Sequence, residues 1–345
     1  MRGIVAGLAL ASVVGCVKAL PPTMEPSQVL EVQTSDGWLL DVRHYPGDGP
    51  PVLLVHGMGA NHYNFDYREE VSLAHFLQQA GWDVWVPEMR GDPGSEGPSR
   101  LAARMYDFDD FARRDLPAAV DGVLAATGQD SLYWVGHSMG GMLLYTAVAD
   151  YPHKIEAGVA ICSPGVFEDA VKASHTLRTL GWVFGGERVL PSRFIADLAG
   201  PLGRMNPFYG RIGNKENYDF AVTNGMARHA VVPLTHATVR QVLDWLEHGE
   251  LVSSEGEPYL EDNGVPVMLM AGSVDRIVAP DDVASTCERY GNCEFKLLGV
   301  EGGMSVEYGH IDPVVGTTVQ AEVYPLVLDF LERHRGAPAS AAVSP

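Results

Sequence analysis

The chain has 345 residues, of which 46% are hydrophobic and 20% are charged, so it has enough apolar surface for a large globular core. Its formal net charge of −20 argues against binding to nucleic acid and against electrostatic docking on anionic lipid. The length favours one large α/β domain with an insertion over two separate domains.

The first 26 residues are predicted to be a leader and linker. One positive charge, Arg2, precedes an apolar stretch, 3–15, that is short for a membrane span and typical of a secretory signal. The run from Val13 to Cys16 is also similar to the lipobox of bacterial lipoproteins, in which Cys16 would carry a lipid. A plain signal peptide with an incidental cysteine and an uncleaved N-terminus are the alternatives. We therefore expect an exported protein, either periplasmic or extracellular, or a lipoprotein anchored to the membrane through Cys16.

The other cysteines also bear on the compartment. Cys287 and Cys293 lie six positions apart, close enough to pair in an oxidising environment. The alternative is two reduced thiols. Cys162 is then expected to be a free, buried thiol at the end of a strand.

The first part of the chain predicts a hairpin followed by buried strands. Residues 29–34 alternate apolar and polar side chains, and a turn separates them from 38–45, which indicates a β-hairpin. The continuous apolar run 51–55 is typical of a strand that is buried on both faces, and 82–86 is predicted to be another buried strand. A helical pattern fills most of the interval between them and ends at Gly81, a C-cap residue.

Strands and helices continue to alternate in the middle of the chain. Residues 109–127 predict a helix that is broken near Pro117. A strand at 131–135, a helix at 139–150 and a strand at 157–162 follow. This alternation at short spacing predicts a parallel sheet with helices on both faces.

The alternation stops after residue 163 and resumes only after residue 249, which predicts an inserted helical cap. Aromatic residues in this stretch either line an apolar substrate pocket or form a small core of the cap itself: Trp182, Phe184, Phe194, Phe208, Tyr209 and Phe220. Beyond it we expect a strand at 265–271, a helix at 281–290, a strand at 294–298 and a last helix at 321–333. The predicted divisions are a leader and linker (1–26), a first core part (27–163), the cap (164–249), a second core part (250–335) and a disordered tail (336–345).

Gly136-x-Ser138-x-Gly140 lies between a predicted strand and a predicted helix. A serine on such a tight turn has its hydroxyl exposed at the top of the sheet. A Cβ at either glycine would collide with the neighbouring strand and helix, and the helix N-terminus offers free N–H groups to a developing negative charge. The motif alone is weak, since chance matches occur. The strand before it and the helix after it favour a nucleophile.

Two later residues complete a candidate catalytic triad in the order serine, acid, histidine. Asp275 follows a buried strand, and His310 lies in a loop after the next strand, so both lie at the same edge of the sheet as Ser138. Ser138 would attack an acyl carbonyl, His310 would act as the base, and Asp275 would orient the imidazole. The backbone N–H groups of Met58 and Met139 are the expected oxyanion donors, each contributing about 3 kcal/mol.

Other titratable residues receive different expectations. Asp312 is the alternative acid, but it follows the histidine, against the chain order. His137 is expected to be a packing residue and His56 to support the oxyanion turn, while Asp66 and Asp92 are interpreted as loop hydrogen-bonders. Solvated surface positions are expected for His229, His236 and His248. No metal-ligand spacing, phosphate loop or dinucleotide motif is found, so neither a metal nor a cofactor is predicted.

These motifs together resemble the α/β-hydrolase superfamily and, within it, the acid-lipase group of esterases. The matching segments are His56–Met58, Gly81–Val86 with Arg90-Gly91, Asp115–Ala118 with Thr127–Gln129, Val135–Gly140 and His310–Asp312. The resemblance implies an α/β-hydrolase fold and hydrolysis of carboxylic esters, lipids among them. The region around Asp275 and the cap match this group poorly. A looser similarity to polyhydroxyalkanoate synthases differs at the elbow, where a serine in place of their cysteine favours transfer to water.

The leading hypothesis is a serine ester hydrolase that acts on an apolar small-molecule or lipid ester without a cofactor. An acyltransferase or a peptidase of the same fold is the first alternative. A peptidase would need a carboxylate cluster facing the site, for which the cap offers Glu168, Asp169, Glu216 and Asp219. A non-catalytic binding protein on a hydrolase scaffold is the second alternative, and a complete triad argues against it. Oligomeric state and acyl chain length do not follow from the sequence.

Overall fold

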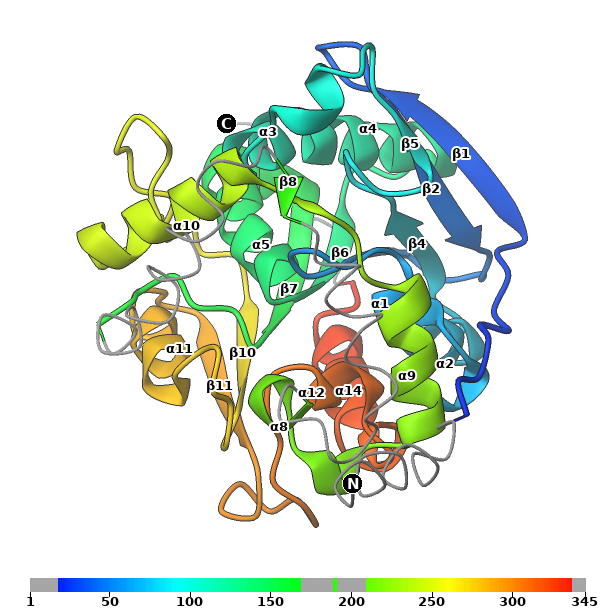
Figure 1. Ribbon diagram of the computed structural model, residues 1–345, viewed down its shortest axis with the longest axis vertical. Coiled ribbons are helices and arrows are strands. Elements are labelled where there is room, and N and C mark those ends of the chain that lie inside the picture. Colours follow the sequence, from blue (N-terminus) through cyan, green and yellow to red (C-terminus); the bar gives the residue numbers. More distant parts are fainter. Residues whose placement is uncertain (1–17, 169–188, 191–208, 337–345) are drawn as a thin grey trace, which may run out of the picture.

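The structure, a computed structural model, describes residues 18–168, 189–190 and 209–336. Its main sheet has the strand order β1-β2-β4-β3-β6-β7-β10-β11, with the short β5 paired to β2. Figure 1 shows this sheet from β1 at one edge to β11 at the other, with helices on both faces. Four of the residues discussed above lie outside the described residues in the cap: Trp182, Phe184, Phe194 and Phe208. Cys16 also lies outside them.

The edge of the sheet formed by the N-terminal strands is antiparallel. The predicted hairpin is present as β1 (Gln28–Gln33) and β2 (Leu39–Tyr45), which pair antiparallel. β2 also pairs antiparallel with β4 (Asp83–Pro87), and β5 (Ser95–Glu96) extends it by a short pairing. The hairpin therefore covers one end of the parallel part of the sheet.

The remaining strands are parallel, as predicted. They are β3 (Pro51–Val55), β6 (Leu132–His137), β7 (Ile155–Ile161), β10 (Val267–Gly272) and β11 (Cys293–Leu298). β3, β6 and β10 are buried along their whole length, which explains their continuous apolar sequences. Because parallel strands end at the same edge, the loops after β3, β6, β10 and β11 are brought together there.

Alternating side chains of the strands divide between two cores, one on each face of the sheet. Val52 belongs to one core and its neighbour Leu53 to the other, as the pleat of a strand requires. The helices that pack on the Val52 side are α2 (Leu73–Gln79) and α14 (Tyr324–Arg333). Those on the Leu53 side are α4 (Leu116–Thr127), α5 (Met139–Asp150) and α11 (Pro280–Cys287).

The predicted break near Pro117 is a change of helix type rather than a gap. α3 (Phe108–Asp110) runs into a π-helical turn, Phe111–Asp115, which continues directly into α4. Proline has no N–H donor, and its ring collides with the carbonyl four residues earlier in an ordinary α-helix. The wider π turn accommodates Pro117 and leaves Asp115 in contact with Arg90.

The last predicted helix is divided in two. The helix expected over 321–333 is observed as α13 (Val319–Glu322) and α14, with Val323 between them. Pro325 lies in the first turn of α14, where the missing N–H costs nothing, and it prevents α13 from continuing. The prediction of a single helix was therefore wrong, because Pro325 interrupts the backbone hydrogen bonds of a continuous helix.

The insertion between β7 and β10 is helical in its described part. It contains α8 (Tyr209–Ile212), α9 (Phe220–His229) and α10 (His236–His248). β9 (Leu234–Thr235) pairs with β8 (Val189–Leu190) in a separate two-stranded sheet. In Figure 1, α9 and α10 lie in front of the main sheet.

The described cap aromatics pack against one another. Tyr209 contacts Tyr218 and Phe220 edge to face, and Tyr218 contacts Phe220 in the same way. Tyr209 is almost completely buried. For these residues, a small core within the cap is therefore the better of the two interpretations.

The chain before β1 packs against α9. The Leu20 N–H donates to the Ala221 carbonyl at 2.8 Å, and the Tyr67 hydroxyl donates to the Leu20 carbonyl at 2.6 Å. A Cβ on Gly225 would lie 1.9 Å from the Leu20 carbonyl oxygen, so only glycine permits this close approach. The part of the predicted linker from residue 18 onward therefore holds the cap to the core.

Cys287 and Cys293 are paired, which is the first of the two alternatives considered for them. Cys287 at the end of α11 and Cys293 at the start of β11 form a disulfide with a Cα–Cα distance of 5.6 Å, so two reduced thiols were the wrong alternative. Cys162 is free and buried, as predicted. Because disulfides persist in oxidising compartments, the bridge favours a protein outside the cytoplasm. None of the helices in the described residues is both long and apolar enough to span a membrane.

Candidate active site

Ser138 lies on a strained turn between β6 and α5. Its backbone φ is 52°, a left-handed value that is unfavourable for any residue with a Cβ. The Ser138 N–H donates to the Ile161 carbonyl at 2.8 Å, which ties the turn to β7. The serine is partly exposed at the carboxyl edge of the sheet.

The glycines of the motif have the steric role expected of them. A Cβ on Gly136 would lie 2.1 Å from the carbonyl oxygen of Gly140 in α5. A Cβ on Gly140 would lie 1.9 Å from the carbonyl oxygen of Val55 in β3. Both positions therefore exclude every residue larger than glycine while the helix is packed this close to the strands.

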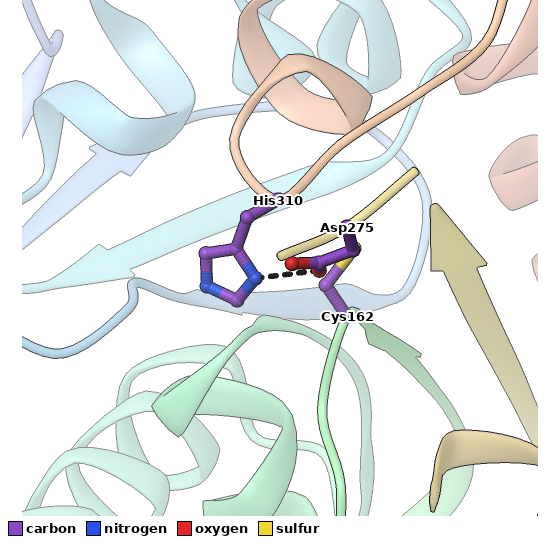
Figure 2. A group of neighbouring side chains, drawn as sticks. All are labelled: Cys162, Asp275 and His310. Carbon is purple, nitrogen blue, oxygen red and sulfur yellow. Dashed lines mark hydrogen bonds and ion pairs between the residues drawn. The ribbon is translucent and has the colours of Figure 1, made fainter. Parts of the chain in front are cut away.

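Ser138, His310 and Asp275 lie in one hydrogen-bonded chain. His310 Nε2 is 3.0 Å from Ser138 Oγ, and His310 Nδ1 is 2.8 Å from Asp275 Oδ2. The three residues follow β6, β11 and β10 respectively, so the carboxyl ends of three strands bring them together. Figure 2 shows the imidazole ring directed at the Asp275 carboxylate. The side chains of His310 and Asp275 are 7% and 1% exposed, which keeps their hydrogen bond away from bulk water.

The environment of Asp275 keeps its carboxylate charged. Burial alone would raise the pKa of Asp275, but the neighbouring His310 and the backbone N–H groups of Val278 and Ile277 hold it below the ordinary value. A charged Asp275 accepts a hydrogen bond from His310 Nδ1–H, which leaves the Nε2 lone pair directed at Ser138. A general base needs this tautomer.

Asp312, the alternative acid, makes different contacts. Its Oδ1 accepts hydrogen bonds from the backbone N–H groups of Gly309 and Asn214, both at 3.0 Å. Burial raises the pKa of Asp312 to about 6. Among the described residues, no hydrogen bond joins it to the His310 ring. Through these two bonds, Asp312 connects the loop that carries His310 to Asn214 in the cap.

A second histidine connects three loops around the site. His137 Nε2 lies 2.9 Å from the His310 carbonyl oxygen, and its Nδ1 lies 3.0 Å from Asn64 Oδ1 in α1 (Tyr63–Asp66). Asn64 Oδ1 also accepts the Gly57 N–H at 3.0 Å. Burial lowers the pKa of His137 to about 3, so the ring is neutral and its single N–H can be donated to only one of these two oxygens. Nothing in the sequence indicates that Asn64 faces back toward the turn at Gly57, so sequence reasoning missed it.

His56 forms a buried ion pair at the same turn. Its Nδ1 lies 3.0 Å from the Gly57 carbonyl oxygen, and its Nε2 lies 2.8 Å from Asp92 Oδ2. Burial alone would lower the pKa of His56, but the Asp92 charge raises it to about 9. Burial raises the pKa of Asp92 to about 6. Both side chains are therefore charged at neutral pH.

This ion pair predicts that the protein loses stability as the pH rises. The pKa of His56 is about 9 in the folded protein against an ordinary 6.5, so the folded protein retains a proton that the unfolded chain releases. The stabilisation is complete below pH 6.5 and disappears as the pH rises through 9. We expect the free energy of unfolding to fall by about 3 kcal/mol over this window. Urea titrations at several pH values should show that the free energy of unfolding falls less with rising pH in His56→Gln than in wild type. An equal fall in the two proteins would contradict the assignment.

The two predicted oxyanion donors line one cavity. Among the described residues, the backbone N–H groups of Met58 and Met139 donate no hydrogen bond, so both are free to bind a ligand. The cavity has a volume of about 20 Å³, which is enough for roughly one water-sized group. Its other walls include Met89, Tyr106 and Phe111 from the core and Val232, Leu234 and Thr238 from the cap.

A buried arginine, Arg90, also lines this cavity. The Arg90 guanidinium bonds to Asp115 at 2.7 and 2.8 Å and to Asp36 at 3.0 and 3.1 Å. The Arg90 N–H also donates to Asp115, at 2.8 Å. This double contact joins the loop after β4 to the segment that begins at Asp115, although 25 residues separate Arg90 from Asp115.

Comparison with known families identifies the fold directly. The family model described as "alpha/beta hydrolase fold" matches residues 50–312, which is well over half of the chain. The chain belongs to the α/β-hydrolase family. Its predicted fold class, a mostly parallel sheet with an inserted segment, is thereby confirmed.

Relatives of this α/β hydrolase place it within a narrower group. The gastric triacylglycerol lipase of Rattus norvegicus is 34% identical over an alignment that covers 89% of this chain and 88% of that protein. Lipase member M of Mus musculus is 33% identical over an alignment that covers 91% of this chain and 84% of that protein. The chain therefore belongs to the acid lipases, a group of carboxylic ester hydrolases. The esterase EaEST of Exiguobacterium antarcticum shares its fold with a TM-score of 0.62 at 16% identity, covering 88% of this chain and 100% of that one.

Proposed function

We propose that this protein hydrolyses carboxylic esters through an acyl-enzyme, with Ser138 as the nucleophile. The observation that supports this most directly is the hydrogen-bonded chain from Ser138 Oγ through the His310 ring to Asp275. A serine hydroxyl becomes an effective nucleophile only when a base removes its proton. His310 Nε2 lies within hydrogen-bonding distance of that proton.

The proposed reaction has two halves that use the same groups. Ser138 Oγ attacks the acyl carbon while its proton moves to His310 Nε2, and the alcohol then leaves with that proton. Water attacks the resulting acyl-enzyme, His310 takes a proton from it, and the acid product leaves as Ser138 regains its hydrogen. Asp275 stabilises the imidazolium in both halves and fixes the ring orientation.

Backbone groups are proposed to stabilise the negative charge on the substrate oxygen. The Met139 N–H belongs to the first residue of α5, where the helix N-terminus favours an anion. The Met58 N–H lies in the turn after β3, which the Asn64 side chain holds through Gly57. These two free donors are suited to an oxyanion hole because neither has to give up another hydrogen bond.

The cavity beside these donors suggests an apolar acyl group as substrate. The cavity that Met58 and Met139 line also has apolar side chains in its wall, among them Met89, Tyr106 and Phe111. The names of the relatives, a triacylglycerol lipase among them, point in the same direction. We therefore propose lipid or other apolar esters as substrates, with water as the acceptor.

The cap offers little support for the peptidase alternative. Its described acidic residues Glu168, Glu216 and Asp219 are all exposed, and Asp219 caps α9 by accepting the N–H groups of Ala221 and Val222. Asp169 lies outside the described residues. No inward-facing carboxylate cluster is therefore found in the described cap to hold a free amine.

The leader suggests where the enzyme acts. We propose that residues 1–15 direct export and that Cys16 is a candidate lipidation site, which would anchor the chain to a membrane. The disulfide between Cys287 and Cys293 supports export, because such bridges form in oxidising compartments.

Hydrolysis of chromogenic acyl esters of increasing chain length tests the proposal. Wild type should turn over at least part of the series, and Ser138→Ala should reduce kcat by about 10⁶-fold, to background. The chain-length optimum then distinguishes a preference for short acyl esters from a preference for long ones. If both proteins are equally active, Ser138 is not the nucleophile. If neither is active on any ester, simple ester hydrolysis is the wrong reaction.

A further inference from the structure

Cys162 lies next to the Asp275–His310 pair and has no part in the proposed reaction. It follows β7 with a backbone φ of 52°, and Ser138 is the only other described non-glycine residue with a positive φ. A strained backbone of this kind is maintained only when the surrounding structure holds it in place. Here it directs the thiol toward the two loops of the pair, with Sγ 3.7 Å from the Gly309 carbonyl oxygen.

We propose that Cys162, Asp275 and His310 form a binding site for a thiophilic divalent cation such as Zn²⁺ or Cd²⁺, and that occupation of this site stops hydrolysis. One ligand atom from each residue lies within 4.8 Å of the other two. Figure 2 shows Cys162 beside the Asp275 carboxylate, which is bonded to His310. Cys162 and Asp275 follow the ends of β7 and β10, and His310 lies in the long loop after β11, so all three lie at the carboxyl edge of the sheet.

The donor set fits zinc in type and spacing. Thiolate sulfur, imidazole nitrogen and carboxylate oxygen are the usual zinc ligands, with bond lengths of roughly 2.0–2.3 Å in tetrahedral geometry. Ligand atoms on such an ion lie roughly 3.3–3.8 Å apart by that geometry. Small side-chain shifts would therefore bring Cys162, Asp275 and His310 into coordination distance, as three of the four ligands of a tetrahedral ion.

The Asp275 carboxylate beside Cys162 supplies a negative charge that favours a cation. A divalent cation would balance the charges of a Cys162 thiolate and the Asp275 carboxylate. The thiol proton would pass to solvent as the sulfur–metal bond forms.

Binding would also change the proton arrangement of His310. The cation needs the Nδ1 lone pair, so the proton that Nδ1 shares with Asp275 must move to Nε2 through solvent. Nε2–H would then donate toward Ser138 Oγ instead of accepting its proton. Since a general base requires the free Nε2 lone pair, the metal-bound ring cannot activate Ser138. The loss of activity rests on the proposed function, whereas metal binding itself does not.

Two measurements on the full chain test this inference. All proteins carry Cys16→Ser, so that Cys162 is the single unpaired cysteine. After removal of metals with a chelator, Zn²⁺ is titrated against ester hydrolysis, and Cd²⁺ is titrated while the ultraviolet thiolate-to-cadmium charge-transfer band is recorded. We expect inhibition that a chelator reverses, together with a band that saturates at one Cd²⁺ per protein. In Cys162→Ala, inhibition should need at least about tenfold more Zn²⁺, and the band should be absent.

Matched variants separate this site from binding elsewhere. Cys162→Ser keeps the size and polarity of the side chain, so it should behave like Cys162→Ala even if the alanine variant folds poorly. His75→Ala removes a surface histidine that lies 3.6 Å from Glu69, and it should leave both titrations unchanged. Equal Zn²⁺ sensitivity with and without Cys162, or no charge-transfer band in the parent, would overturn the inference. A band in a protein that hydrolyses no ester would support the metal site and reject the proposed function.

Discussion

Replacing Asp275 by asparagine is expected to lower kcat for ester hydrolysis by about 10⁴-fold with little change in KM. The amide keeps the shape of the side chain, but its NH₂ group cannot accept a hydrogen bond from His310 Nδ1–H. The ring then loses the tautomer in which Nε2 faces Ser138 Oγ at 3.0 Å. Steady-state kinetics on the best ester of the series, with circular dichroism to verify folding, measures this effect.

Asp312→Asn is the matched control for Asp275→Asn. Both aspartates lie close to His310, and both are buried, but Asp312 bonds to the backbone at Gly309 and Asn214 rather than to the imidazole. An asparagine Oδ1 can still accept those two N–H groups. We therefore expect kcat to fall by less than about tenfold, because the tautomer of His310 is unaffected. A larger loss for Asp312→Asn than for Asp275→Asn would reverse the assignment of the acid.

The largest effect on stability is expected for Asp115→Ala. The Asp115 carboxylate is completely buried and bonds to both the guanidinium and the backbone of Arg90. Its removal leaves a buried cation that keeps the Asp36 contacts, a weaker approach to Asp110 at 3.5 Å and its position over the Trp38 ring. Loss of one partner from a buried ion pair typically costs about 3–5 kcal/mol, and Asp36 should keep the loss near the lower end of this range. Denaturant unfolding at pH 7 measures it.

An exposed ion pair provides the comparison. Asp121 lies on the neighbouring helix α4 and pairs with Lys154, but its side chain is 60% exposed. Solvent screens such a pair, so Asp121→Ala should lower the free energy of unfolding by no more than about 1 kcal/mol. Similar losses for Asp115→Ala and Asp121→Ala would mean that burial does not strengthen the Arg90 contacts.

The parts of the fold that could be predicted depend on local sequence. The runs at β3 and β6 are continuously apolar because both faces of these strands are buried. The steric role of Gly136 and Gly140 could be predicted from the sequence, because the space in a tight strand-to-helix turn is limited by residues close in the chain. Ser138, Asp275 and His310 occur in this order along the chain because they follow β6, β10 and β11 respectively.

Contacts between distant segments could not be predicted in the same way. Asn64 joins Gly57 to His137 only because α1 packs against the nucleophile turn, and no periodicity in the sequence records that packing. The position of Cys162 beside Asp275 depends on the backbone torsion after β7, to which residue type is a poor guide. Chain order favours Asp275 over Asp312 as the acid of the triad. The contacts of the two carboxylates, which only the structure shows, decide between them.

The position of the cap in the chain has a consequence for synthesis. β7 pairs with β6 immediately before it, but its other neighbour, β10, is translated roughly 100 residues later, after the entire insertion. At about 5–20 residues per second, the outer edge of β7 stays unpaired on the ribosome for about 5–20 s. During that interval its free N–H and C=O groups can pair with a neighbouring nascent chain. This edge therefore stays open to such pairing until β10 is made, and slower translation of the insertion lengthens the interval.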